Sequence, residues 1–233
     1  AGAETEVSCS GLDTGQRTAV LAVWGQSNAT NAHTRQYTPS GDVYMVFNGK
    51  CYVSRDPVLG TTGVGGSFIN RLADKLIDSG AYDRVIISAT AVAGSFISEW
   101  APGTDNFGYT VTQLYQMEQL GFHIDFGVFM QGESDTSLGT TSAEYYAGLD
   151  DMVSGLSIYG GINIPVYVSK TSYCFGVSST AVRQAQGYAA STLPGVFAGP
   201  DTDTLTTGYR RDDCHFNGAG SDLLAEMWAE ALQ

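Results

Sequence analysis

The stretch TAVLAVWGQSN, residues 18–28, joins an unbroken apolar run to a short polar cluster. A strand that is apolar on both of its faces is typical of a parallel sheet covered by helices on both sides. In such sheets, ligands bind beyond the carboxyl ends of the strands. The polar residues that follow the run, Ser27 above all, are therefore candidates for a functional site.

Apolar runs and helix-like stretches alternate along the rest of the chain, with no internal repeat and no break in composition that would mark a domain boundary. This alternation predicts a doubly wound α/β sandwich, and 233 residues fit one domain over 1–233. Strands are expected at 18–24, 84–90, 124–131, 164–169 and 195–199, and helices at 67–80, 111–121, 142–156 (capped by Ser142), 179–191 and 220–233.

The net charge of −13 restricts the classes of partner. An acidic surface repels the phosphate backbone of nucleic acids and the anionic surface of membranes, so neither is expected to bind. The longest apolar runs have the length of strands, so no membrane span is expected. The charge is compatible with a protein that acts on neutral substrates.

The four cysteines, Cys9, Cys51, Cys174 and Cys214, lack the CxxC spacing of a zinc or redox site. Their even number and the low lysine content favour a secreted or extracellular protein with two disulfides, with free buried thiols as the alternative. A start at Ala1 fits removal of a signal peptide or trimming of the chain. Sequence order favours the pairs Cys9–Cys51 and Cys174–Cys214 among three pairings.

Ser27 has two interpretations. A serine that follows a strand commonly caps a helix. Alternatively Gly25 permits a tight turn, and a helix starting near Asn28 would direct its free N–H groups at a developing oxyanion, which would suit a nucleophile.

The segment RRDDCHFNGAG, residues 210–220, favours the interpretation of Ser27 as a nucleophile over that of a helix cap. A serine hydroxyl needs an imidazole to take its proton and an acid to orient that imidazole. Asp212, Asp213 and His215 supply both groups from one short loop. Taken without Ser27, the same residues would be interpreted as a solvated acidic pair and a surface histidine.

A third polar segment, FMQGESD at 129–135, ends another expected strand. The Gln131 side-chain amide has the chemistry of an oxyanion donor. Glu133 and Asp135 are expected to have supporting structural roles, in a turn or at a helix cap.

GQSN, QGESD and DxxH, in this order, resemble the SGNH hydrolase superfamily, and within it the carbohydrate esterases grouped with sialate O-acetylesterases and acetylxylan esterases of family 6. The resemblance extends from Gly25 to Gly218 and includes the segment 56–76. It implies a three-layer α/β/α sandwich with a mostly parallel, flavodoxin-like sheet. It also implies a catalytic triad and no cofactor or metal.

The resemblance assigns roles by position. Ser27 would be the nucleophile, and His215 the general base and then the general acid. Asp212 would orient His215, although its neighbour Asp213 remains an alternative for this role. Cys214, between acid and base, suggests a disulfide that fixes the loop.

The implied oxyanion hole has three donors: the backbone N–H groups of Ser27 and of Gly94 in AVAGSF, and the side-chain amide of Gln131. Asn28 would support the site. Trp100, Tyr109 and Tyr173 follow or border strand-end loops and are expected to stack on sugar rings.

The sequence therefore predicts a metal-independent serine esterase that removes acetyl groups from a carbohydrate. Acetylxylan, sialic acid and another acetylated polysaccharide remain alternative substrates. Two rival functions are a carbohydrate-binding or adhesin module without catalysis, and a general short-chain esterase, thioesterase or lipase.

Overall fold

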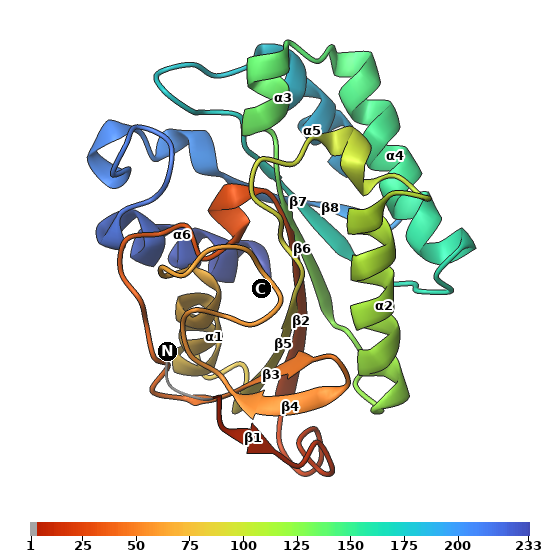
Figure 1. The fold of residues 1–233 in the computed structure, drawn as a ribbon, viewed down its shortest axis with the longest axis vertical. Coiled ribbons are helices and arrows are strands. Elements are labelled where there is room, and N and C mark those ends of the chain that lie inside the picture. Colours follow the sequence, from red (N-terminus) through yellow and green to blue (C-terminus); the bar gives the residue numbers. More distant parts are fainter. Residues whose placement is uncertain (1–3) are drawn as a thin grey trace.

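The structure is a computed structural model that describes residues 4–233, and within them the strands form one eight-stranded sheet (Figure 1). The strands are β1 (Glu6–Val7), β2 (Thr18–Gly25), β3 (Asp42–Phe47), β4 (Lys50–Val53), β5 (Arg84–Ala89), β6 (Phe126–Met130), β7 (Val166–Lys170) and β8 (Val196–Asp201). Their order is β1-β4-β3-β5-β2-β6-β7-β8. The pairs from β3 to β8 are parallel, and only β4 and β1 add antiparallel strands at one edge.

Helices cover both faces of this sheet, so the expected three-layer α/β/α sandwich is confirmed (Figure 1). Helices α1 and α6 lie on one face, and α2, α4 and α5 lie on the other. The helices are α1 (Ile69–Asp78), α2 (Asp105–Gln119), α3 (Glu133–Leu138), α4 (Ser142–Ile158), α5 (Thr180–Thr192) and α6 (Gly218–Ala231).

Strand β2 is buried on both faces, as its composition predicts. Alternate side chains of a strand point to opposite faces. Val20 and Trp24 accordingly pack in the core beneath α2 and α4, whereas Leu21 and Val23 pack in the core beneath α1 and α6. The apolar run at 18–24 thus joins two hydrophobic cores, which explains why it lacks polar alternation.

The order of the strands places β2 at the topological switch point of the sheet. The chain leaves β2, builds β3, β4 and β5 on one side, and then crosses to β6, β7 and β8 on the other. Strand β2 therefore pairs with β5 and with β6 in parallel. The loops that follow these three strands meet at one edge of the sheet, where ligands bind in this architecture.

Most expected elements are confirmed, with ends shifted by a few residues. Two details were wrong. The helix expected at 111–121 begins at Asp105, because Thr104 caps it by accepting a hydrogen bond from the N–H of Phe107. Thr141, not Ser142, caps α4, and its capping box pairs it with Glu144.

The sequence analysis missed β1, β3, β4 and the short helix α3. The hairpin of β3 and β4 could have been predicted from the sequence, because Asn48 and Gly49 connect the two strands. Both residues have positive φ, at 50° and 72°. An Asn-Gly pair in a two-residue turn is a strong mark of a hairpin.

Both expected disulfides, Cys9–Cys51 and Cys174–Cys214, are present. The first links the segment after β1 to β4. The second joins the loop after β7 to the segment before α6. Among residues 4–233, no helix has the length and apolar character needed to cross a membrane.

Candidate active site

Three of the predicted site residues lie in loops that leave the same edge of the sheet. Ser27 follows β2, Gly94 lies in the loop after β5, and Gln131 follows β6 directly. Since β2 pairs with β5 on one side and β6 on the other, these loops are neighbours. The fold thus brings together residues that are more than a hundred positions apart in the chain.

Ser27 begins a single 3₁₀ turn, Ser27–Ala29, in place of the helix expected near Asn28. The turn is closed by Thr30, whose backbone N–H and hydroxyl both donate to the carbonyl oxygen of Ser27. Among residues 4–233, the side chain of Ser27 makes no hydrogen bond and so caps no helix. The residue is buried, with 7% of its surface exposed.

Gly25 makes this sharp exit from β2 feasible. Its φ is +139°, and a Cβ atom at this position would lie 2.0 Å from the carbonyl oxygen of Met130. The backbones of β2 and β6 can approach this closely only because residue 25 has no side chain. The glycine of GQSN therefore has a packing reason in addition to the tight turn that the sequence analysis expected.

Asp212 and His215, the predicted acid and base, come from the loop between the 3₁₀ turn at Thr207–Tyr209 and α6. The carboxylate of Asp212 accepts a hydrogen bond from the backbone N–H of His215 at 2.7 Å and pairs with His215 Nδ1 at 2.8 Å. Partial burial alone would raise the pKa of Asp212, but these bonds hold it below its ordinary value. Asp212 therefore stays ionised and fixes the orientation of the imidazole.

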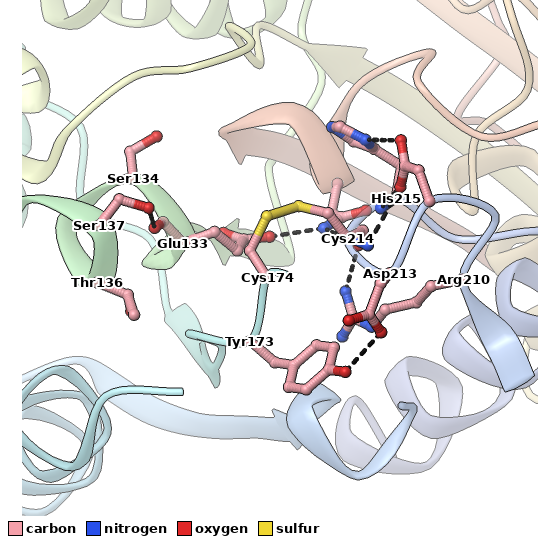
Figure 2. The surroundings of a disulfide bond; sticks show 12 residues. Glu133, Ser134, Thr136, Ser137, Tyr173, Cys174, Arg210, Asp213, Cys214 and His215 are labelled. Atoms are coloured by element: carbon pink, nitrogen blue, oxygen red, sulfur yellow. Dashed lines mark hydrogen bonds and ion pairs between the residues drawn. A yellow bond between two sulfur atoms is a disulfide. The ribbon is translucent and has the colours of Figure 1, made fainter. Parts of the chain in front are cut away.

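Asp213 points elsewhere. Its carboxylate accepts hydrogen bonds from the hydroxyls of Tyr173, at 2.6 Å, and Thr207, at 2.9 Å (Figure 2). Asp213 also has the left-handed backbone conformation, with φ of 60°. Of the two acids that the sequence left open, Asp212 is the one that contacts His215.

The residue before Ser27 ties the serine turn to the QGESD segment. Gln26 is buried, and its side-chain oxygen accepts hydrogen bonds from the Gln131 amide at 3.0 Å and from the backbone N–H groups of Gly132 and Ser134. Three donors from one short segment converge on a single oxygen. The positions of GQSN and QGESD are thereby fixed relative to each other.

The residue after Ser27 ties the serine turn to the loop of the base. The side chain of Asn28 donates to the carbonyl oxygen of Cys214 at 3.2 Å and accepts from the backbone N–H of Phe216 at 3.3 Å. These residues flank His215 on both sides. Asn28 also donates to Glu133 at 2.7 Å, so it joins all three motifs.

Gln131 does not fit the oxyanion role that the resemblance implied. Its amide nitrogen lies within hydrogen-bonding distance of the side-chain oxygen of Gln26, the carbonyl oxygen of Ser95 and the carboxylate of Asp135. An amide nitrogen carries only two hydrogens. Both are committed to buried partners, and the hydroxyl of Tyr145 donates to the amide oxygen. In this structure the Gln131 side chain connects Gln26, Ser95 and Asp135 by hydrogen bonds.

Gly94 keeps its fit to the oxyanion role. The neighbouring N–H of Ala93 donates to the Thr62 hydroxyl, whereas the Gly94 N–H makes no hydrogen bond within residues 4–233. Gly94 has φ of +75°, and no atom lies within 4 Å of where its Cβ would be. A substrate can therefore approach this backbone closely.

Glu133 and Asp135 are both buried, at 2% and 1% exposure, and both make hydrogen bonds within the site. Asp135 accepts from the N–H of Ile97, the hydroxyl of Thr140 and the amide of Gln131. Glu133 is less well satisfied, because one of its carboxylate oxygens has no hydrogen-bond partner among the described residues. Burial raises its pKa to about 7, against the lowering effect of the Asn28 hydrogen bond.

The disulfide Cys174–Cys214 adjoins His215 directly in sequence, and Figure 2 shows it between Glu133 and the loop of the base. Arg210 supports the same loop from within. Its guanidinium donates to the carbonyl oxygen of Cys214 and stacks over the rings of Phe216 and Tyr173, at 4.2 and 4.9 Å. The loop that carries the acid and the base is therefore anchored covalently and by a buried cation.

His33 is a residue whose role sequence reasoning missed. It is buried, with Nδ1 2.7 Å from the Ser221 hydroxyl and Nε2 3.1 Å from the carbonyl oxygen of Asn28. It thus connects the serine turn to α6. Burial lowers its pKa to about 3, so it is neutral at physiological pH. Only its proximity to Ser27 in sequence hinted at this.

The three aromatic residues expected to stack on sugars are placed differently. Trp100 is 1% exposed and donates from its indole nitrogen to Ser95, so it belongs to the core and cannot present a face to a sugar. Tyr109 and Tyr173 are half-buried, with hydroxyls bonded to the carbonyl oxygen of Gly60 and to Asp213.

Asp201 and Asp203 both pair with Arg183, at 2.7 and 2.9 Å. Among residues 4–233, no group of three or more His, Cys, Asp or Glu is arranged to hold a metal ion.

Residues 19–233 match the family described as carbohydrate esterase, sialic acid-specific acetylesterase. The chain belongs to this esterase family. The match covers β2 to α6 and includes all three motifs. It leaves out only the amino-terminal segment that contains β1 and Cys9.

Several solved structures share this fold. A protein from Arabidopsis thaliana superimposes with a TM-score of 0.77 at 16% identity, over 93% of this chain and 98% of that one. NanS gives 0.66 at 14% identity, over 93% and 96%. Est24, a carbohydrate acetylesterase from Sinorhizobium meliloti, gives 0.56 at 13% identity, over 91% and 97%. No match was found among curated proteins.

Proposed function

We propose that this member of the esterase family is a serine esterase that removes O-acetyl groups from a carbohydrate. The observation that carries the proposal is the pair of hydrogen bonds from His215 to Asp212, in a loop that Asn28 ties to the turn of Ser27. This arrangement supplies a nucleophile, a base and an orienting acid at the edge of the sheet where ligands bind.

In the proposed reaction, the Ser27 oxygen attacks the acetyl carbonyl carbon while His215 Nε2 takes the hydroxyl proton. Asp212 keeps the other ring nitrogen protonated and stabilises the imidazolium. Within residues 4–233 the Ser27 hydroxyl makes no hydrogen bond, and catalytic hydrogen bonds often form only when substrate is bound.

The tetrahedral intermediate carries a negative oxygen. The N–H of Ser27 lies at the start of its 3₁₀ turn, where N–H groups lack partners within the turn, and the N–H of Gly94 is unpaired among the described residues. We assign the oxyanion to these two donors. Collapse of the intermediate breaks the ester bond, and His215 returns its proton to the sugar oxygen. Water, activated by the same histidine, then releases acetate from Ser27.

The proposed substrate is an acetylated carbohydrate, with acetylxylan, sialic acid and other acetylated polysaccharides as the classes to compare. The net charge of −13 suits neutral glycans better than polyanions. Two disulfides suit an extracellular enzyme, because such bonds persist in oxidising compartments.

The test measures acetate release from 4-nitrophenyl acetate, acetylated xylan, O-acetylated sialic acid and an acetylated bacterial polysaccharide. Wild type is compared with Ser27→Ala and with Ser98→Ala, an exposed serine near the same edge. We expect release by wild type and Ser98→Ala, and none by folded Ser27→Ala. Glycan binding without acetate release in wild type would overturn the proposal and favour a binding module. Activity on the nitrophenyl ester alone would favour a general esterase.

A further inference from the structure

The side chain of Asn28 holds both neighbours of the proposed base. Its Nδ2 donates to the carbonyl oxygen of Cys214, and its Oδ1 accepts from the N–H of Phe216. His215 lies between these two residues. The residue that follows Ser27 therefore contacts the backbone on either side of His215, so this amide directly links the positions of nucleophile and base.

An asparagine amide can bind in two orientations that exchange its oxygen and nitrogen. Here Cys214, Phe216 and Glu133 all select the same orientation, and Glu133 is the partner that can carry a charge. Its carboxylate lies 2.7 Å from Asn28 Nδ2 and accepts a hydrogen bond from it. In the reversed orientation the amide oxygen would face the carboxylate, and two acceptors would repel each other. The orientation that Glu133 selects is the one that satisfies both bonds to the loop of His215.

The carboxylate of Glu133 is costly to bury. It is 2% exposed, and its second oxygen has no hydrogen-bond partner among the described residues. A buried acid with an incomplete set of partners destabilises a fold unless it can stay neutral. A purely structural role would be filled more cheaply by a glutamine, which also accepts a hydrogen bond.

We propose that Glu133 is a positioning residue, which orients the Asn28 amide and through it sets the position of His215 relative to Ser27. The inference rests on the proposed function, because it assumes that His215 and Ser27 react together. Glu133 touches neither the substrate nor the reacting atoms in this account. Its effect passes through Asn28.

The charge of Glu133 depends on the groups around it. Arg210 favours the charged form of Glu133, and Asp203 opposes it. The charge of Glu133 in turn raises the pKa of the nearby Tyr145 hydroxyl. Burial is the largest effect and brings the pKa of Glu133 to about 7. An ionised carboxylate forms a stronger hydrogen bond with Asn28 than a neutral acid does. Loss of the charge below neutral pH should therefore loosen the orientation of Asn28.

The experiment measures kcat and KM for 4-nitrophenyl acetate across a pH series in wild type, Glu133→Ala, Glu133→Gln, Asn28→Ala and the double alanine variant. The control is Glu118→Gln, an exposed glutamate on α2. A misplacement of a reacting group by about 1 Å can cost about 10²-fold in rate. We expect a loss of that order in kcat for each single alanine variant, with little change in KM. The double variant should be no worse than either single one, since both break the same linkage.

Glu133→Gln keeps an acceptor for Asn28 but cannot ionise. It should recover most of the activity near neutral pH, and the acid side of its kcat profile should lack the ionisation that Glu133 is expected to contribute in wild type. This variant also retains the shape of the side chain, so it decides the matter if Glu133→Ala fails to fold.

Two failures can be told apart. Suppose that wild type is active and Ser27→Ala is inactive, but the Glu133 and Asn28 variants keep the wild-type kcat and pH profile. This inference is then overturned, and the proposed function stands. If wild type has no esterase activity, both are overturned.

Discussion

The carboxylate of Asp212 binds His215 twice, accepting from its backbone N–H at 2.7 Å and pairing with its Nδ1 at 2.8 Å. The first bond fixes the turn, and the second fixes the ring. Asp213, the adjacent acid, binds Tyr173 and Thr207 instead. This difference between neighbouring carboxylates leads to a direct comparison.

Asp212→Asn should lower kcat by about 10³–10⁴-fold, because an amide leaves the imidazole in the wrong tautomer for accepting a proton from Ser27. Asp213→Asn loses the charge on two surface-facing hydrogen bonds, and should cost less than about tenfold. The measurement is kcat for 4-nitrophenyl acetate in both variants. A large loss in Asp213→Asn with near-normal activity in Asp212→Asn would reverse the assignment.

Gln131→Ala should reduce stability as well as activity. The substitution removes one buried hydrogen bond each from Gln26, Asp135 and Tyr145, which keep their other partners, and each such bond typically contributes about 0.5–1.5 kcal/mol. Urea unfolding measures the change, with Gln119→Ala on the exposed surface of α2 as the control. A variant with wild-type stability and a 10²–10³-fold lower kcat would restore the oxyanion role.

The two disulfides offer a matched pair of perturbations. Their cysteines are separated by 42 and 40 residues, so chain entropy predicts similar losses of stability, about 4 kcal/mol each. Only Cys174–Cys214 adjoins His215. Replacing that pair with serines should therefore lower kcat in the folded protein, while replacing Cys9 and Cys51 should leave kcat near the wild-type value.

The comparison is made well below the melting temperature of both variants. Equal kcat values for the two would show that the bond beside His215 has no part in holding the base in place.

His33 should make the fold sensitive to acid. Its pKa is 6.5 in an ordinary setting and about 3 in the folded protein, where burial excludes the charged form. Between these values the unfolded chain binds a proton that the folded protein does not, so this contribution is complete above pH 6.5 and is lost as pH falls. The slope from one such group is about 1.4 kcal/mol per pH unit.

Urea unfolding across that pH range, in wild type and His33→Gln, tests this prediction. The free energy of unfolding should fall more steeply with acid in wild type than in His33→Gln. His123→Gln, at an exposed position, should follow wild type. Identical slopes for wild type and His33→Gln would exclude a buried neutral His33.

The strands buried on both faces were predictable, because an apolar run such as 18–24 leaves few alternatives to a covered parallel sheet. The edge strands were harder. Strand β1 has two residues, and β4 has four, of which only Cys51 is buried. Such short elements form through pairing with a neighbour and leave little periodicity in the sequence. Only the Asn48-Gly49 turn in the sequence indicated the hairpin of β3 and β4.

The site was predictable where a residue's role depends on its own chemistry and on short spacing. Asp212 and His215 are three residues apart, so one turn brings them together. The roles of Gln131 and Glu133 depend on partners more than a hundred positions away, at Gln26 and Asn28. A motif shows that these residues belong together. It does not show which of their atoms are already bonded.

The most direct test of the account is covalent labelling of Ser27. A fluorophosphonate reacts with a serine that an adjacent base activates, and peptide mass spectrometry identifies the residue modified. We predict modification of wild type at Ser27, much slower modification in His215→Ala, and no modification at this site in Ser27→Ala. An enzyme that releases acetate but carries the label on another residue would contradict the assignment of Ser27 as the nucleophile.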